Sequence, residues 1–386
     1  MFSVRSSDPE RSRGSAGEKK MERWHETVKK QWETEPRTEG SSRLNGVLRL
    51  ASSLYGLGVK LRFFSYGVLK KRSLPGLVVS VGNLTVGGTG KTPATRMLAE
   101  WAAKEGHRVA VLSRGYGGRY ENKTLEVSDM NGILAGPEEA GDEPYLLANN
   151  LPGVPVILSK KRYTAGLLAH KKYDTDIYIL DDGFQHISLE RDLDLVLMDA
   201  SNPFGNEQLL PGGPLREPVD HLARADAFML TRSNEESSAK KSIALLKDRF
   251  PDKPVFQSDH IPDSVVIPNK NEVHAPGFLE GKRVIAFAGI AAPDRFRETI
   301  INLGAEPVFF KAFGDHHTFQ TVELLKLITQ KESLKADYLL TTEKDWVRIE
   351  GPLTEYPDLS YLTIRLALKS DKNRFFQLIK DKIRSS

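Results

Sequence analysis

Eight consecutive residues have the composition of a phosphate-binding loop. They read TVGGTGKT and follow the apolar run LVVSVGN at 77–83, which predicts a buried strand. The glycines allow backbone N–H groups to turn towards phosphate oxygens, the lysine reaches the β- and γ-phosphates, and the last threonine can ligate magnesium. The residues predicted to bind a nucleotide are Thr85, Val86, Gly87, Gly88, Thr89, Gly90, Lys91 and Thr92. Thr85 stands where this motif usually has its first glycine, so a chance Gly-rich turn is the alternative.

Two adjacent carboxylates end a second apolar run. Residues 177–186 read IYILDDGFQH, which places Asp181 and Asp182 at the end of a predicted strand. A strand-end carboxylate is the usual second magnesium contact in P-loop proteins, and paired carboxylates suit hard cations. Both motifs would lie at the carboxyl edge of one sheet, where open α/β folds bind ligands. We therefore predict magnesium ligation by Thr92 with Asp181 or Asp182; a simple strand-end turn is the alternative.

Five further motifs carry polar side chains whose role cannot be assigned from spacing alone. GDEP opens a predicted helix, where Asp142 can also be an ordinary N-cap. The two adjacent histidines of FGDHHTF suggest a metal site, but no cysteine or obvious third ligand supports zinc. The five motifs are SRGYGG at 113–118, GDEP at 141–144, LPGGPLREP at 210–218, FGDHHTF at 313–319 and TTEKD at 341–345.

Apolar runs alternate with helical segments from Pro75 onwards. Buried strands that alternate with helices indicate a parallel α/β sheet covered on both faces, which we assign to a P-loop domain at 73–262. Helices are expected between several of the strands, for example at Lys91–Lys104 and Asp142–Asn150. The predicted strands are Leu77–Val81, Val109–Leu112, Val154–Leu158, Ile177–Leu180, Leu193–Met198 and Ala227–Leu230.

A second series of the same kind predicts a smaller α/β domain at 263–386. The Pro- and charge-rich stretch around Asp259–Gly281 is the expected boundary. Helices are expected near Arg295–Asn302 and Gln320–Lys331. The strands of this series are Val284–Ala288, Pro307–Phe310, Tyr338–Leu340 and Leu359–Ile364.

The chain before the first strand divides into two segments. Residues 1–42 form a polar arm, for which a solvated tail is expected and a short amphipathic helix is the alternative. Residues 43–72 contain seven basic and no acidic residues among leucines and aromatics. Such a basic amphipathic segment suits the plane of an anionic membrane surface, although a helix pair that covers a sheet has a similar pattern.

Composition excludes several classes of protein. The chain of 386 residues contains no cysteine, which rules out disulfides, thiolate metal sites and a cysteine nucleophile. Its net charge of +4 is too small to imply a nucleic-acid partner. We predict no secretory signal, because residues 1–42 are strongly polar and contain no apolar central region. We predict no transmembrane span, because no apolar stretch reaches the roughly 18–20 residues that a bilayer requires.

The ordered set of motifs is more specific than any one of them. VGNLTVGGTGKTP, SRGYGG, GDEP, DDGFQH, LPGGPLREP, FGDHHTF and TTEKD occur in this order. Together they resemble the tetraacyldisaccharide 4'-kinase family of lipid A biosynthesis, from about Leu44 to the C-terminus. That family accepts threonine or serine at the position of Thr85. The resemblance implies two α/β P-loop-like or Rossmann-like domains with the active site in the cleft between them.

The resemblance also implies roles for individual residues. Asp142 matches the proposed catalytic base, and a histidine of the DHH motif assists it, for which we favour His316 over His317. Lys91 and Thr92 would hold phosphate and magnesium. The residues implied around the substrate are Tyr116, Arg162, Gln185, His186 and Arg216.

The implied reaction transfers the γ-phosphoryl group of ATP, with Mg²⁺, to the 4'-hydroxyl of a tetraacyl glucosamine disaccharide 1-phosphate. The product would be the bisphosphorylated lipid A precursor. The implied location is the cytoplasmic face of the inner membrane of a Gram-negative bacterium, reached through residues 43–72. The alternative is a P-loop ATPase that serves as a switch or assembly factor without a sugar acceptor. No guanine-specifying N-K-x-D motif is present, which disfavours GTP.

Overall fold

The computed structural model describes residues 32, 42–68, 71–115, 123–349, 355–369 and 371–385. These residues form two compact units, each of which is described by itself. The first unit contains the described residues up to 68 together with 84–87 and 204–222, and the second contains the remainder. The predictions for the polar arm, apart from Trp32, lie outside the described residues.

One long helix, α2 (Ser42–Val68), dominates the first unit. One face of α2 packs on the segment 204–222. There the Ser52 hydroxyl bonds the Leu209 carbonyl at 2.9 Å, and the ring of Phe63 lies 4.2 Å from that of His221. The basic segment therefore forms a single helix rather than a helix pair.

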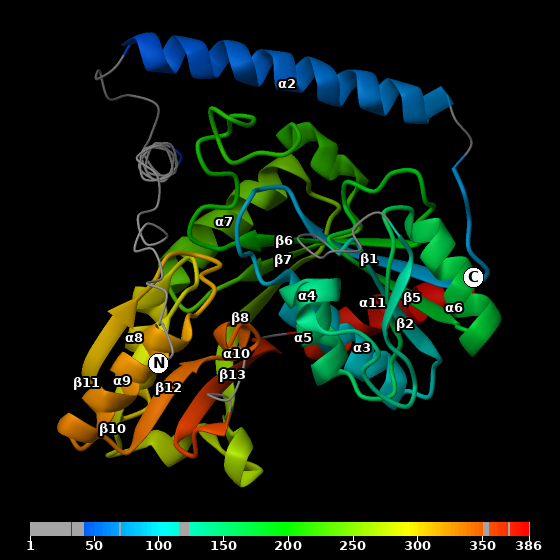
Figure 1. The fold of residues 1–386 in the computed structure, drawn as a ribbon. Coiled ribbons are helices and arrows are strands. Elements are labelled where there is room, and N and C mark those ends of the chain that lie inside the picture. Colours follow the sequence, from blue (N-terminus) through cyan, green and yellow to red (C-terminus); the bar gives the residue numbers. More distant parts are fainter. Residues whose placement is uncertain are drawn as a thin grey trace, which may run out of the picture. The chain divides into compact units, whose positions relative to one another are not determined.

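The second unit is built on one mixed, mostly parallel sheet (Figure 1). The strand order is β11-β10-β12-β13-β8-β7-β6-β1-β5-β2-β4-β3, and β9 pairs with β8. Among the described strands, the antiparallel pairs are β3 with β4, β8 with β13 and β8 with β9. The strands are β1 (Leu77–Asn83), β2 (Val109–Ser113), β3 (Leu125–Ser128), β4 (Val156–Leu158), β5 (Ile177–Asp181), β6 (Leu193–Asp199), β7 (Ala227–Thr231), β8 (Val255–Ile267), β9 (Glu272–His274), β10 (Arg283–Ala288), β11 (Glu306–Ala312), β12 (Tyr338–Thr342) and β13 (Leu359–Leu368).

Helices cover both faces of the first half of this sheet, as the alternating pattern predicts. Alternate residues of β1 divide between the two faces, because side chains of a strand point to opposite sides. Val79 and Val81 pack with α3, α5 and α11, whereas Val78 packs with α6. The helices of the second unit are α3 (Lys91–Lys104), α4 (Pro137–Ala140), α5 (Asp142–Asn150), α6 (Arg162–Tyr173), α7 (Glu236–Arg249), α8 (Pro293–Asn302), α9 (Thr321–Ser333), α10 (Glu343–Trp346) and α11 (Lys372–Ser385).

The second half of the sheet repeats this arrangement around β10. Ile285 and Phe287 pack against α9, and Val284 and Ala286 pack against α8. The predicted strands and helices of both series are confirmed. The long strand β8 was not predicted, and it runs through the expected boundary between residues 262 and 263. Both halves therefore share one continuous sheet, and the two-domain division remains a prediction.

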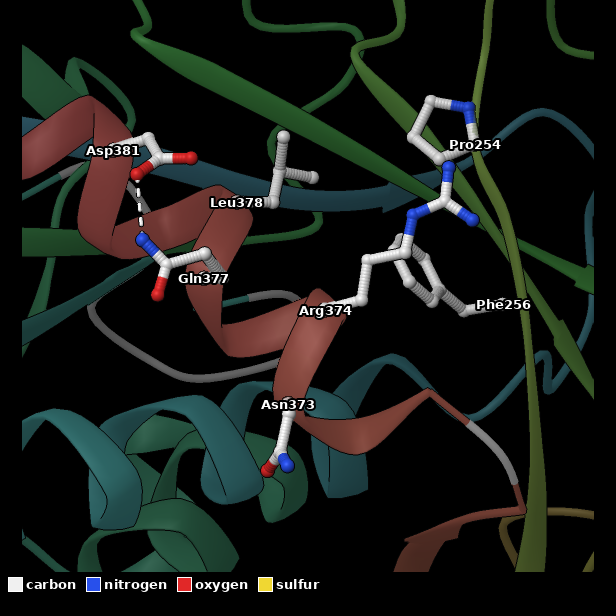
Figure 2. A pocket seen from close by; sticks show the side chains of 7 residues that line it. All are labelled: Pro254, Phe256, Asn373, Arg374, Gln377, Leu378 and Asp381. Atoms are coloured by element: carbon white, nitrogen blue, oxygen red, sulfur yellow. Dashed lines mark hydrogen bonds between the residues drawn. The ribbon is translucent and has the colours of Figure 1, made fainter.

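A cavity of about 520 Å³ lies between α11 and the start of β8 (Figure 2). Arg374, Leu378 and Asp381 of α11 line it together with Pro254 and Phe256. It opens at the amino end of β8, whereas the predicted phosphate-binding residues follow the carboxyl ends of the parallel strands β1 and β5. The cavity is therefore separate from the predicted site.

Candidate active site

The phosphate-binding loop joins β1 to α3 as predicted. Gly90 directly precedes α3 and has φ of +87°, a conformation that favours glycine. A Cβ atom at this position would collide with the ring of His260. Helix α3 begins at Lys91, so its N-terminal N–H groups and positive dipole end are available to an anion.

The start of the loop belongs to the first unit, and the rest belongs to the second. Within the first unit, Val86 donates its N–H to the Pro214 carbonyl at 2.8 Å, and Thr85 forms a bridge with Leu215. The LPGGPLREP segment therefore supports the backbone at Thr85, the position that departs from the usual motif. Arg216 lies in the same unit, where its carbonyl accepts a hydrogen bond from Tyr55.

Two residues at the end of β7 hold the rest of the loop. Thr231 donates its hydroxyl to the Thr89 carbonyl at 3.1 Å. Arg232 donates to the Gly88 carbonyl and pairs with Asp199 at 2.5 Å. Sequence reasoning missed both residues, although they follow a predicted strand. Their place at the carboxyl end of a predicted parallel strand, the same edge as the loop, was the signal that could have identified them.

Lys91 and the two strand-end carboxylates meet at the carboxyl edge of the sheet. The Lys91 ammonium lies 3.7 Å from the Asp182 carboxylate. Asp181 accepts hydrogen bonds from the hydroxyls of Thr95 and Ser113, each at 3.2 Å. The structure therefore brings the loop and the DDGFQH motif together as predicted.

Asp181 is a buried carboxylate, and the positive charge of Lys91 only partly offsets the cost of ionising it there. Burial, with the charges of Glu143 and Asp182, raises its pKa to about 6, against the opposing effects of Lys91 and the Ser113 hydroxyl. A cation at this position would stabilise the ionised form. No group of three or more acidic or histidine side chains among the described residues is arranged as a closed metal site. Asp181 and Asp182 thus suit a magnesium ion that takes its other ligands from phosphate and Thr92.

Other polar groups around the loop also suit an anion. The buried Thr89 hydroxyl has no hydrogen-bond partner in the structure, and neither does Nε of Arg162. Arg162 begins α6, where its guanidinium lies 3.5 Å from the Asp181 carbonyl. Burial lowers the pKa of Arg162 to about 10 despite the nearby Asp181 and Asp182, so the side chain remains charged at neutral pH.

Asp142 lies in the first turn of α5. Two side chains from elsewhere in the chain approach it: the predicted His316 and Arg348, which was not predicted. The Arg348 Nε–H donates to the Asp142 carboxylate at 2.6 Å, and His316 Nδ1 lies 3.7 Å from the same oxygen. Burial raises the pKa of Asp142, but hydrogen bonds and charge from His316 and Arg348 outweigh it and lower the pKa to about 2. Asp142 is therefore ionised at neutral pH.

Three polar contacts join α5 to the segment around α10. Besides the Asp142–Arg348 pair, Lys344 lies 3.2 Å from Glu143, and Asn150 donates to Glu343 at 2.7 Å. The charge of Glu143 also raises the pKa of Asp181, so the first turn of α5 lies near that carboxylate. The TTEKD motif thus fixes α5 from the second half of the sheet.

The remaining predicted residues have separate positions. His317 pairs with Glu323 at 2.8 Å, near the start of α9, so His316 is the histidine beside Asp142. Gln185 donates to the Asn83 carbonyl at 2.9 Å, and His186 bonds Ser188 at 3.3 Å. Tyr116 lies outside the described residues.

Comparison with known proteins decides the family. The family model of the tetraacyldisaccharide-1-P 4'-kinases matches residues 44–384. The chain belongs to the tetraacyldisaccharide 4'-kinase family. The family resemblance predicted from the ordered motifs is thereby confirmed.

Individual relatives match most of the chain. A tetraacyldisaccharide 4'-kinase of Geobacter metallireducens is 40% identical over 320 residues, which cover 82% of this chain and 92% of that protein. One from Syntrophobacter fumaroxidans is 42% identical over 347 residues, covering 86% and 87% of the two chains. A crystal structure of LpxK from Aquifex aeolicus in complex with ATP is 34% identical, with a TM-score of 0.71, and covers 88% of this chain and 99% of that one.

These matches establish a kinase with the predicted reaction. The chain is an ATP-dependent tetraacyldisaccharide 4'-kinase of lipid A biosynthesis, and its mixed α/β fold is that of LpxK. The alternative of an ATPase switch without a sugar acceptor is not supported. These matches do not assign roles to single residues, a magnesium ion or a membrane contact.

Proposed function

We propose that this kinase transfers the γ-phosphoryl group with Asp142 as the acceptor of the 4'-hydroxyl proton. The observation that carries this proposal is the Asp142 carboxylate in the first turn of α5, which pairs with Arg348 at 2.6 Å and lies 3.7 Å from His316. Phosphoryl transfer needs charge neutralisation at the phosphates and a hydroxyl held in line with the bond that breaks. Lys91 supports the first requirement and Asp142 the second.

The low pKa of Asp142 has a consequence for this step. A carboxylate with a pKa of about 2 is a weak base, so it cannot remove a hydroxyl proton before the phosphoryl group moves. In a loose transition state the hydroxyl becomes acidic only as its bond to phosphorus forms. Asp142 would therefore orient the hydroxyl first and accept the proton late.

We propose that a magnesium ion bound with ATP takes Thr92 and one of the Asp181–Asp182 pair as its protein ligands. The raised pKa of Asp181 supports this, because a buried carboxylate gains stability from a cation. When bound, the ion would neutralise charge on the β- and γ-phosphates. Arg162, with its unpaired Nε, is proposed to contact an anionic group of the substrate. Tyr116, Gln185, His186 and Arg216 are proposed as further substrate residues.

We propose that α2 lies on the cytoplasmic face of the inner membrane. Six apolar side chains of α2 are between 54% and 73% exposed, and they recur every three or four residues, so they share one face. These residues are Val47, Leu50, Leu54, Leu57, Leu61 and Phe64, which we call the α2 outer stripe. The exposed cations Arg49, Lys60 and Arg62 on the same helix favour anionic head groups. None of the described helices combines the length and hydropathy of a membrane span.

The role of Asp142 is tested with Asp142→Asn, which keeps the size and removes the charge. We expect kcat to fall by about 100-fold or more with ATP affinity nearly unchanged, because the base is lost and the phosphate loop is intact. The measurement is phosphorylated lipid formed from ATP and disaccharide 1-phosphate, with nucleotide binding by calorimetry. A variant with the normal rate would remove Asp142 from the proposed role.

A further inference from the structure

Arg348 is almost completely buried and contacts four segments of the chain at once. Only 5% of its side chain is exposed. Its Nε–H donates to Asp142 at 2.6 Å, and one terminal nitrogen donates to the Gly289 carbonyl at 3.1 Å and to Asp345 at 3.2 Å. The other terminal nitrogen lies 3.0 Å from His316 Nδ1. One guanidinium therefore links the start of α5, the end of β10, the loop after β11 and helix α10.

The position of Arg348 is fixed by its second carboxylate, Asp345. Asp345 is fully buried, and its other oxygen accepts from the Gly289 N–H at 2.9 Å and from the Thr342 hydroxyl at 2.8 Å. A planar guanidinium between two carboxylates and a carbonyl cannot rotate without losing several charge-assisted hydrogen bonds. Asp142, at the exposed end of this chain of contacts, is thus held by a rigid partner.

The contact with Arg348 also determines how His316 can be protonated. A guanidinium donates hydrogen bonds and accepts none, so His316 Nδ1 must be the acceptor. The ring is then neutral with its proton on Nε2. The distance of 3.7 Å between Nδ1 and the Asp142 carboxylate is too long for a hydrogen bond, and Nδ1 has no proton to donate. In this tautomer His316 gives Asp142 neither a hydrogen bond nor a charge, so Arg348 alone holds the pKa of Asp142 below its ordinary value.

We propose that Arg348 is a positioning residue for phosphoryl transfer. It holds Asp142 ionised and aimed at the acceptor, and it fixes His316 in the form protonated on Nε2, with that N–H available to the substrate. This inference rests on the proposed role of Asp142. It adds a third member, 206 residues away in the sequence from Asp142, to the pair implied by the family resemblance.

The kinetic test compares Arg348→Met and Arg348→Lys with the wild type. We expect Arg348→Met to lower kcat by about 100-fold while the KM for ATP stays within about twofold, because the base is misplaced and the phosphate loop is not. Loss of the cation raises the pKa of Asp142, so the acidic limb of the rate profile moves to higher pH. Arg348→Lys keeps one charge and is expected to show a smaller change in pH profile. Arg365→Met, at an exposed arginine paired with Asp263, is the control.

Added methylguanidinium provides a second readout. A merely structural role predicts no rescue of Arg348→Ala, whereas a positioning role predicts recovery of kcat with saturation in methylguanidinium. Unchanged kcat and an unchanged pH profile in Arg348→Met, with the variant folded by circular dichroism, would overturn the proposal.

The histidine tautomer is tested in the wild-type protein, which avoids any folding defect of a variant. Nitrogen NMR of ¹⁵N-histidine protein, assigned with His316→Gln, is expected to show an unprotonated Nδ1 and a protonated Nε2 at neutral pH. A proton on Nδ1 would contradict the link through Arg348. This result does not depend on catalysis, so it separates a failure of the Arg348 proposal from a failure of Asp142 as the base, which Asp142→Asn tests alone.

Discussion

Asp181 shows most clearly how burial and charge oppose each other in this site. Its pKa lies at about 6 in the folded chain, against an ordinary value of 3.8. The ionised form is therefore less favourable in the folded state than in the unfolded state. The folded state therefore loses no stability at pH values below 3.8, the pKa of Asp181 in the unfolded chain. The loss grows as the pH rises and is complete above about 6, the pKa of Asp181 in the folded chain. A bound cation reverses this effect, which links folding to occupation of the site.

Asp181→Asn is expected to raise the stability of the nucleotide-free protein by about 2–3 kcal/mol at pH 7.5, and by less at pH 5. The reason is that the variant lacks the charge whose burial is unfavourable. Urea unfolding at the two pH values measures this difference. Asp182→Asn is the control, because that carboxylate is 37% exposed. An Asp181→Asn variant that is less stable than the wild type at pH 7.5 would contradict the account.

The element that places the nucleotide is the turn between β1 and α3. Gly90→Ala is expected to weaken ATP binding by at least tenfold, because alanine at a φ of +87° is strained and its Cβ meets the ring of His260. Gly132→Ala is the control, since this residue lies outside the loop and no atom lies within 4 Å of a Cβ there. Calorimetry with ATP distinguishes the two. Equal affinity of both variants would show that the turn at Gly90 does not define the loop.

Exposed and buried apolar side chains lie on different faces of α2. The exposed ones can therefore be replaced to test the membrane proposal without unfolding the protein. Leu54 and Leu61 are exposed on the α2 outer stripe, whereas Leu48 of the same helix is buried. We expect Leu54→Glu with Leu61→Glu to reduce binding to vesicles of anionic phospholipid by about tenfold or more. The control is Ser53→Glu with Ser65→Glu, which adds the same charge at exposed polar positions of the helix and leaves the α2 outer stripe unchanged.

Vesicle flotation measures both pairs of variants. An equal loss of binding in the two pairs would mean that net charge, rather than the α2 outer stripe, controls attachment. Binding that is unchanged in the leucine variant would remove α2 from the membrane contact. A concentration-dependent change in sedimentation would indicate instead that the stripe contacts a second copy of the chain.

At the scale of the whole molecule, the sequence predicted the strands and the phosphate-binding loop, because these features depend on the pattern of neighbouring residues. Apolar runs bounded by turns revealed the strands on either side of the loop, and the spacing of glycine and lysine revealed the loop itself. The strand β8 was missed because Asp259, His260 and Pro262 break its apolar pattern, although it pairs with three other strands, β7, β13 and β9. A strand whose side chains are only partly buried carries little periodic signal.

The candidate site shows the same limit. Asp142 and His316 were proposed through a family resemblance, whereas Arg348 and Arg232 could not be chosen from many arginines. The Asp142–Arg348 contact joins residues 206 apart, and it depends on the pairing of β8 with both β7 and β13, which unites the two halves of the sheet. Long-range contacts of this kind depend on topology, which a single sequence does not reveal.

The central claim is that this site couples ATP cleavage to phosphorylation of a lipid disaccharide. The most direct measurement follows ADP and the bisphosphorylated lipid in the same sample, with ATP, magnesium and disaccharide 1-phosphate in detergent micelles. The account predicts equal amounts of the two products, and almost no ADP without the lipid. Rapid ADP release without the lipid, together with no bisphosphorylated product in its presence, would contradict it.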